Sequence, residues 1–200
     1  ARSCARRAPW PAPCARIAAA TPPWRRWSIA GTSARPADPP WRPVSAQVPA
    51  LSSENIARRN IYVWLPDGYP AGEKYDVIYF HDGQMLFDST QTWNKQEWGV
   101  DEVISELLQQ KKIRPCIVVA ISNSGDGRHA DYCPQKPLLS LPSNLRDSFS
   151  ANPVFKGHKL SSDNYLRFIV KTLKPYIDKN FYVNRKVAHT FIAEIGRAHV

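Results

Sequence analysis

The sequence predicts an α/β fold in which helices cover both faces of a mostly parallel sheet. Three short segments, residues 61–65, 77–80 and 117–121, are apolar on both faces, as strands buried inside such a sheet are. Segments with the one-sided apolar spacing of amphipathic helices alternate with these strands. This alternation is typical of α/β proteins, and 200 residues are enough for one domain of that class.

Four strands are predicted along the chain. The first, residues 61–65, ends at the turn sequence Pro66-Asp67-Gly68. The second, Val77 to Phe80, is followed at once by polar residues. Ile117 to Ile121 and Val187 to Ala193 are two further apolar runs of strand length.

Two amphipathic helices are predicted between and after these strands. The first has acids at its start and lysines at its end, which suits a helix dipole, and one apolar face: Val100, Val103, Ile104, Leu107 and Leu108. The second begins at residues 161–163, where Ser or Asp can cap the first turn, and Pro175 kinks or ends it. Its predicted buried face consists of Leu166, Ile169, Val170 and Leu173.

The beginning of the chain differs in composition from the rest. The first 50 residues hold ten of the 18 prolines and seven of the ten net positive charges. No apolar period runs through them, so residues 1–46 are predicted to be a disordered or non-native Pro/Ala/Arg-rich tail. Arginines among tryptophans would also suit a nucleic-acid-binding tail, but the composition favours disorder, and no nucleic-acid partner is expected. Residues 47–194 are predicted to form the folded domain.

Cysteines and targeting signals add little to this prediction. No apolar segment reaches the length of a membrane span or of a signal peptide core. The four cysteines show neither metal-ligand spacing nor a disulfide framework. We therefore expect no metal and no other cofactor, while the compartment and the oligomeric state stay open.

Polar residues directly follow the strand that ends at Phe80, and in α/β sheets ligands bind beyond the carboxyl ends of the strands. Gly83 allows a sharp turn that points the backbone N–H of Gln84 into a cavity, where it can stabilise the oxyanion of an acyl-transfer intermediate. The same residues also suit a tight turn in which Asp82 caps local amides. A metal or phosphotransfer site at Asp82 and Asp88 is disfavoured, because no phosphate-cradling glycine loop accompanies them.

Five stretches carry a resemblance to a known family, in the family's order: 59–69 (RNIYVWLPDGY), 77–88 (VIYFHDGQMLFD), 92–102 (TWNKQEWGVDE), 128–134 (RHADYCP) and 173–181 (LKPYIDKNF). With TFIA at 190–193, they resemble the esterase D-like branch of the α/β-hydrolase family, which includes enterochelin esterases and S-formylglutathione hydrolase. The resemblance covers about two thirds of the chain. It implies that residues 47–194 are the N-terminal part of an α/β-hydrolase domain.

The resemblance implies acyl-ester cleavage by a serine on a G-x-S-x-G turn after residues 190–193, completed by an acid and a histidine. The sequence has Glu194, Ile195 and Gly196 there and contains no G-x-S-x-G. We therefore expect an N-terminal fragment, inactive by itself, of a serine carboxylic-ester hydrolase with a small-molecule ester substrate. Residues 195–200 are expected to be an artefactual end. The alternatives are an acyltransferase of the same fold and a non-catalytic esterase-like binding domain.

The loops after the strands supply the remaining candidate site residues. Gly83 and the backbone N–H of Gln84 are expected to form half of the oxyanion hole. Candidates for substrate contact are Trp93, Trp98, Arg128 and Tyr132. The two tryptophans suit the core equally well, and Arg128 would alternatively brace its loop by pairing with Asp131. The residues expected to order the loops are His81, Asp82 and Asp131.

Overall fold

The computed structural model describes residues 46–48, 56–90 and 92–195. The expected disordered tail, residues 1–46, and the expected artefactual end, residues 195–200, lie almost wholly outside these ranges and stay predictions. In the described part, no helix has the length and apolar character needed to cross a membrane.

The described strands form one five-stranded sheet, in the order β1-β2-β4-β3-β5. The strands are β1 (Ala46–Val48), β2 (Ile61–Trp64), β3 (Asp76–Phe80), β4 (Cys116–Ile121) and β5 (Thr190–Ala193). β3 is parallel to both β4 and β5, whereas β2 is antiparallel to β4 and to β1. Two of the four pairings are parallel and two are antiparallel, so the sheet is mixed, with only β2 running against the other described strands. The predicted α/β fold is confirmed.

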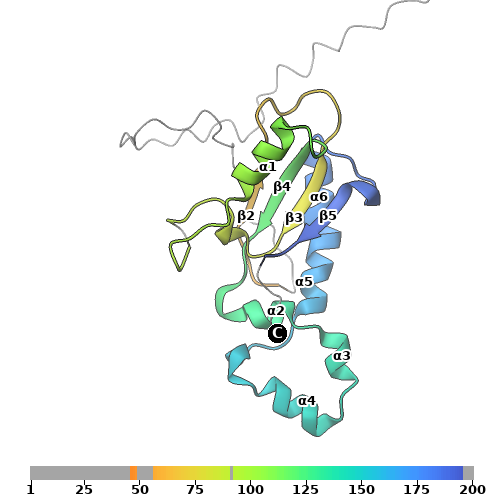
Figure 1. Cartoon of the computed structure of the whole chain (residues 1–200). Helices are drawn as coiled ribbons and strands as arrows, with labels where there is room; N and C mark the ends of the chain where they lie inside the picture. The colour runs from red at the N-terminus through yellow and green to blue at the C-terminus, as the bar shows by residue number, and fades with distance from the viewer. Residues whose placement is uncertain (1–45, 49–55, 91, 196–200) are drawn as a thin grey trace, which may run out of the picture. The chain divides into compact units, whose positions relative to one another are not determined.

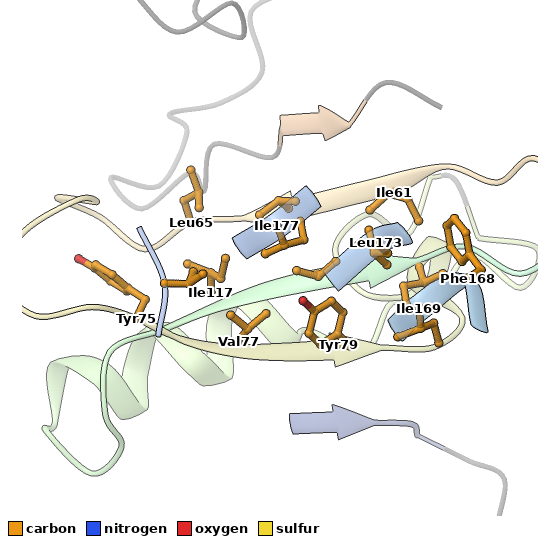
Figure 2. Packing of buried hydrophobic residues seen from close by; sticks show 14 of the residues in the cluster. Ile61, Leu65, Tyr75, Val77, Tyr79, Ile117, Phe168, Ile169, Leu173 and Ile177 are labelled. Atoms are coloured by element: carbon orange, nitrogen blue, oxygen red, sulfur yellow. The ribbon is translucent and has the colours of Figure 1, made fainter. Parts of the chain in front are cut away.

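The side chains of β2, β3 and β4 alternate between two cores, one on each face of the sheet. One core joins Val77 and Tyr79 of β3 to the helical segment 162–180. Figure 2 shows these strand side chains lying opposite Phe168, Leu173 and Ile177. On the other face, Phe80 and its neighbours pack against α1 (Val100–Gln109), which Figure 1 shows on the side of the sheet away from α6.

Helix α1 forms where predicted, but its buried face is rotated from the predicted one. Val100 and Ile104 are buried and Leu108 packs against the core, whereas Val103 is 54% exposed. Asp101 lies on the buried side of the helix instead and is only 5% exposed. The prediction for Val103 was wrong because five apolar residues make a stripe wider than the part of the helix that the sheet covers.

The buried carboxyl group of Asp101 makes the stability of the domain depend on pH. Its Oδ1 atom has no hydrogen-bond partner among the described residues, and neither has the buried Oε2 of Glu102. Burial, followed by the neighbouring Glu102 and Glu97, raises the pKa of Asp101 from 3.8 to about 7. An acid whose pKa rises on folding binds more protons in the folded state, so stability is lost as the pH rises from 3.8 to about 7.

We expect the Asp101→Asn variant to be more stable than the unchanged chain at high pH. The amide carries no charge, so the gain is absent at about pH 4, grows with pH, and reaches on the order of 2 kcal/mol above about pH 7. Urea unfolding across this range measures the gain. The exposed Asp147 provides the control variant Asp147→Asn, which should show no such trend. A gain from Asp101→Asn that does not change with pH would contradict the explanation.

The second predicted helix is continuous from residue 162 to residue 180. It consists of α5 (Ser162–Phe168), a π-helical segment (Ile169–Leu173) and α6 (Lys174–Asn180). Pro175 lies in the first turn of α6 and does not end the helix. The π-helical turn, whose hydrogen bonds span one residue more than those of an α-helix, ends two residues before this proline.

The buried face of this helix differs from the predicted one at two positions. Leu166 and Val170 are 52% and 56% exposed, whereas Tyr165 and Phe168 are buried. Two apolar stripes were possible on this helix, and the one with the larger aromatic side chains faces the sheet. Aromatic rings bury more surface than Leu or Val, which explains why that stripe wins.

The last strand is shorter than predicted. Residues Val187–His189 form a 3-10 turn, and only β5 pairs with the sheet. The side chain of Val187 is 89% exposed, and Phe191 and Ile192 are 43% and 56% exposed. In the described part, β5 has a strand neighbour on one side only.

The segment between β4 and α5 contains three helices that were not predicted from the sequence. They are α2 (Arg128–Tyr132), α3 (Gln135–Leu139) and α4 (Ser143–Ser150). Figure 1 shows all three beyond the carboxyl end of β4. We call residues 134–160, which include α3, α4 and the 3-10 turn Pro153–Phe155, the lobe.

Candidate active site

The end of β3 is tied to the strands on both of its sides. The backbone N–H of His81 donates to the carbonyl oxygen of Ala193 at the end of β5, over 3.0 Å. Asp82 then adopts a left-handed backbone conformation, with φ 51°, and opens the 3-10 turn Gly83–Met85. The N–H of Met85 closes this turn on the carbonyl oxygen of Asp82. The polar residues after Phe80 are therefore held in one conformation.

Gly83 is required at this turn for space. A Cβ atom at this position would lie 2.5 Å from the carbonyl carbon of Ala120 and 2.5 Å from the nitrogen of Ile121, both in the backbone of β4. The sequence predicts a sharp turn of the backbone at Gly83, but the structure places the left-handed conformation at Asp82. Gly83 instead allows the turn to lie directly on the end of the neighbouring strand.

Asp82 is the centre of a buried ion-pair network. It is 3% exposed, and the guanidinium of Arg128 donates to both of its carboxylate oxygens. Asn123 Nδ2 and the hydroxyl of Tyr132 also donate to Oδ1 of Asp82. Burial by itself raises the pKa of Asp82, but these hydrogen bonds and the charge of Arg128 outweigh it and hold the pKa below its usual 3.8. The network joins the end of β3 to the segment after β4.

Asp131 belongs to a second network, so the alternative pair of Arg128 with Asp131 does not form. Its carboxylate accepts from Nη2 of Arg59 at 3.1 Å, from the hydroxyl of Ser161 at 2.7 Å and from Ser124. The spacing R-x-x-D suggested a local pair. In the short helix α2, however, Arg128 pairs with Asp82 and Asp131 pairs with Arg59.

A cavity of about 340 Å³ lies beside these networks. Its lining residues are His81, Asp131, Tyr132, Pro134, Gln135, Lys136, Pro137, Ser162, Asp163, Tyr165, Leu166 and Glu194. His81 Nδ1 lies 2.6 Å from the hydroxyl of Tyr165, and the rings of His81, Tyr132 and Tyr165 are mutual neighbours, 5.3 to 5.5 Å apart. Burial raises the pKa of both tyrosines, so their phenols keep their protons near neutral pH.

Gly83 and Gln84, the residues expected to form half of the oxyanion hole, are not among the residues that line this cavity. The side-chain Oε1 of Gln84 accepts from the N–H of Asn123 at 3.1 Å, which fixes the turn from a second side. Of the four candidates for substrate contact, only Tyr132 lines the cavity. Trp93 is 85% exposed, Trp98 packs against the core under α1, and Arg128 is held by Asp82.

Sequence reasoning missed Asn123 and Tyr165. Asn123 lies just beyond the end of β4, so the strand-end rule that selected His81 and Asp82 would also have found it. Tyr165 carried no such signal, because the predicted buried face of this helix contained Leu166 and Val170 and left Tyr165 outside it. In the described part, no group of three His, Cys, Asp or Glu side chains is arranged to hold a metal ion.

Comparison with known proteins gives a family match over most of the chain. The Esterase family model, described as "Putative esterase", matches residues 52–193. No curated protein matches the sequence.

Several solved structures are similar to this chain. The BES protein from Bacillus cereus has 20% identity and a TM-score of 0.50, over 81% of this chain and 54% of that one. An IroE-like serine hydrolase from Shewanella oneidensis has 26% identity and a TM-score of 0.49, over 72% and 40%. The ferulic acid esterase AmCE1/Fae1A from Anaeromyces mucronatus, solved with ferulic acid, has 19% identity and a TM-score of 0.47, over 82% and 51%. The chain thus spans about half the length of the structures that it matches.

Proposed function

The chain belongs to the Esterase family, and from this membership we propose that it is the N-terminal part of a serine carboxylic-ester hydrolase. Carboxylic-ester hydrolysis is the activity that the family and the fold support. The further parts of the proposal are the serine mechanism, the role of each residue, and a small-molecule ester as substrate.

The observation that carries the proposal is the anchored turn after β3. Gly83 lies on the backbone of β4, the side chain of Gln84 is bonded to Asn123, and Asp82 is held by Arg128. A donor that stabilises an oxyanion must keep its position while charge develops, since reorganisation during the reaction would cancel the gain. A turn fixed on three sides meets that requirement.

In the proposed reaction, a serine oxygen attacks the ester carbonyl carbon, and the carbonyl oxygen becomes an oxyanion. The backbone N–H of Gln84 donates a hydrogen bond to this oxyanion. The cavity lined by His81, Tyr132 and Tyr165 receives one side of the ester. Asp82, Arg128 and Asp131 act by positioning these groups.

The 200 residues contain no G-x-S-x-G sequence, so the nucleophile of this proposal belongs to further sequence of a longer protein. The acid and the histidine of the triad would come from the same further sequence. The unextended chain serves as the natural negative control, because it carries the proposed oxyanion donor without a nucleophile.

The test measures hydrolysis of p-nitrophenyl esters and labelling by a serine-directed fluorophosphonate, in the longer protein and in the 200-residue chain. We expect labelling of the longer protein only. In the longer protein, Gln84→Pro removes the N–H and should lower kcat about 100-fold or more, as the loss of one oxyanion donor does. Gln84→Ala is the matched control, because it loses the same side chain but keeps the N–H, and it should lower kcat less than about tenfold.

Two outcomes would overturn the proposal. A folded longer protein that neither hydrolyses esters nor reacts with the probe would be a binding domain. Equal losses for Gln84→Pro and Gln84→Ala would place the oxyanion donor elsewhere. Transfer of the acyl group to an alcohol faster than to water would identify an acyltransferase, the alternative of the same chemistry.

A further inference from the structure

The lobe contains a second cavity that the proposed ester chemistry does not use. Its volume is about 320 Å³, within the usual range for sites that bind small molecules. The lining residues are Gln135, Leu138, Leu139, Arg146, Ser150, Phe155, Gly157, His158, Lys159 and Leu160. Helix α3 separates this cavity from the one beside His81, since Gln135 lines both.

The wall of the lobe cavity is apolar on one part and basic on another. Leu138 and Phe155 are 8% and 3% exposed and form its closed apolar part. Arg146 and Lys159 carry positive charge, and none of the lining residues is acidic. Within the described residues, neither Arg146 nor Lys159 forms an ion pair. Asp147 follows Arg146 in α4 but does not line the cavity.

We propose that the lobe cavity binds an amphipathic carboxylate, that is, a short alkyl chain or an aromatic ring that ends in one carboxylate group. The apolar part of such a ligand would contact Leu138 and Phe155. Its carboxylate would meet Arg146, whose planar guanidinium can donate two parallel hydrogen bonds, and Lys159. The partly exposed Arg146 and the exposed Lys159 are both open to such a ligand, because neither is paired with an acid among the described residues.

Two sources can supply this chemistry. One is a free carboxylic acid, and the other is a carboxylate at the far end of a larger ester whose ester group lies in the cavity beside His81. The shared wall formed by α3 makes the second source geometrically reasonable. The proposal itself concerns binding to the lobe and does not depend on the proposed hydrolase function.

The experiment titrates the complete 200-residue chain with octanoate by calorimetry and compares octylammonium and octanol, which have the same chain length. We expect octanoate to bind at least about tenfold more tightly than either, because a charge-assisted pair adds about 1.5 kcal/mol or more. The double variant Arg146→Gln and Lys159→Gln should lose this preference. The double variant Lys171→Gln and Lys179→Gln, on the exposed side of the 162–180 helix, removes the same charge elsewhere and should keep it.

Equal binding of octanoate and octylammonium would overturn the proposal. An equal loss in both double variants would also overturn it, since the chain carries a net charge of +10 and could attract anions without a site. The monomethyl ester of octanedioic acid distinguishes the two sources. Tighter binding than octanoate points to an ester with a distal carboxylate, and weaker binding points to a free acid.

Discussion

Replacing Gly83 by alanine should destabilise the domain by about 4 kcal/mol. The new Cβ atom would lie 2.5 Å from two backbone atoms of β4, where no side-chain rotation can relieve the contact. Either β4 or the turn after β3 must move, and both are held by buried strands, so the usual penalty for overpacking is exceeded. Chemical denaturation followed by far-UV circular dichroism measures the loss.

The matched control is Gly72→Ala. Gly72 has a φ of +65°, but nothing lies within 4 Å of the Cβ atom that alanine would add. The free energy of unfolding of this variant should fall by only about 1 kcal/mol, which is the cost of a left-handed conformation for alanine. Similar losses in the two variants would mean that the turn after β3 does not press on β4, and the anchoring argument for Gln84 would fail with it.

Replacing Asp82 by asparagine should destabilise the domain by about 3 kcal/mol, because the partly buried guanidinium of Arg128 loses its charged acceptor at the end of β3. Asparagine keeps nearly the same shape and tolerates the left-handed backbone that Asp82 adopts. The change therefore isolates the charge. The free energy of unfolding in urea, at neutral pH, gives the loss.

The difference between Asp82→Asn and the unchanged chain should disappear in acid. The pKa of Asp82 is lowered on folding, so its contribution to stability is present above 3.8, its ordinary value, and is lost as the pH falls below it. The exposed pair of Asp126 with Lys156 provides the control, because Asp126→Asn should produce no measurable change. A loss for Asp82→Asn that persists unchanged at low pH would show that geometry, and not charge, matters at this position.

The elements that could be predicted from the sequence are those whose pattern is local, and the ones that were missed depend on contacts between residues far apart in the sequence. β3 and β4 were predictable because a short run that is apolar on both faces has few other uses in a folded chain. The lobe was not predictable, since α3 and α4 are short and their burial depends on contacts with each other and with residues 153–160. An amphipathic period needs more turns than these helices have.

The same reasoning explains the errors at the site. Asp82 and Arg128 could be selected from the sequence because they lie in loops that follow strands. Their pairing could not, because they are 46 positions apart and a local pair of Arg128 with Asp131 was an alternative. Arg59 decides between these two arrangements by taking Asp131. The sequence contained no sign that Arg59, which precedes β2, reaches this loop.

The position of β5 has a consequence for the order in which the sheet assembles. Asp76 of β3 pairs with Cys116, 40 positions later, whereas Val77 pairs with Thr190, 113 positions later. Closing the longer loop costs about 0.9 kcal/mol more chain entropy than closing the shorter one. β5 also gains less burial and fewer hydrogen bonds than β4 does, because within the described residues it has one strand neighbour and half-exposed side chains. We therefore expect β3 and β4 to join before β5 is added, so that the bond from His81 to Ala193 forms late and the turn after β3 acquires its final surroundings only then.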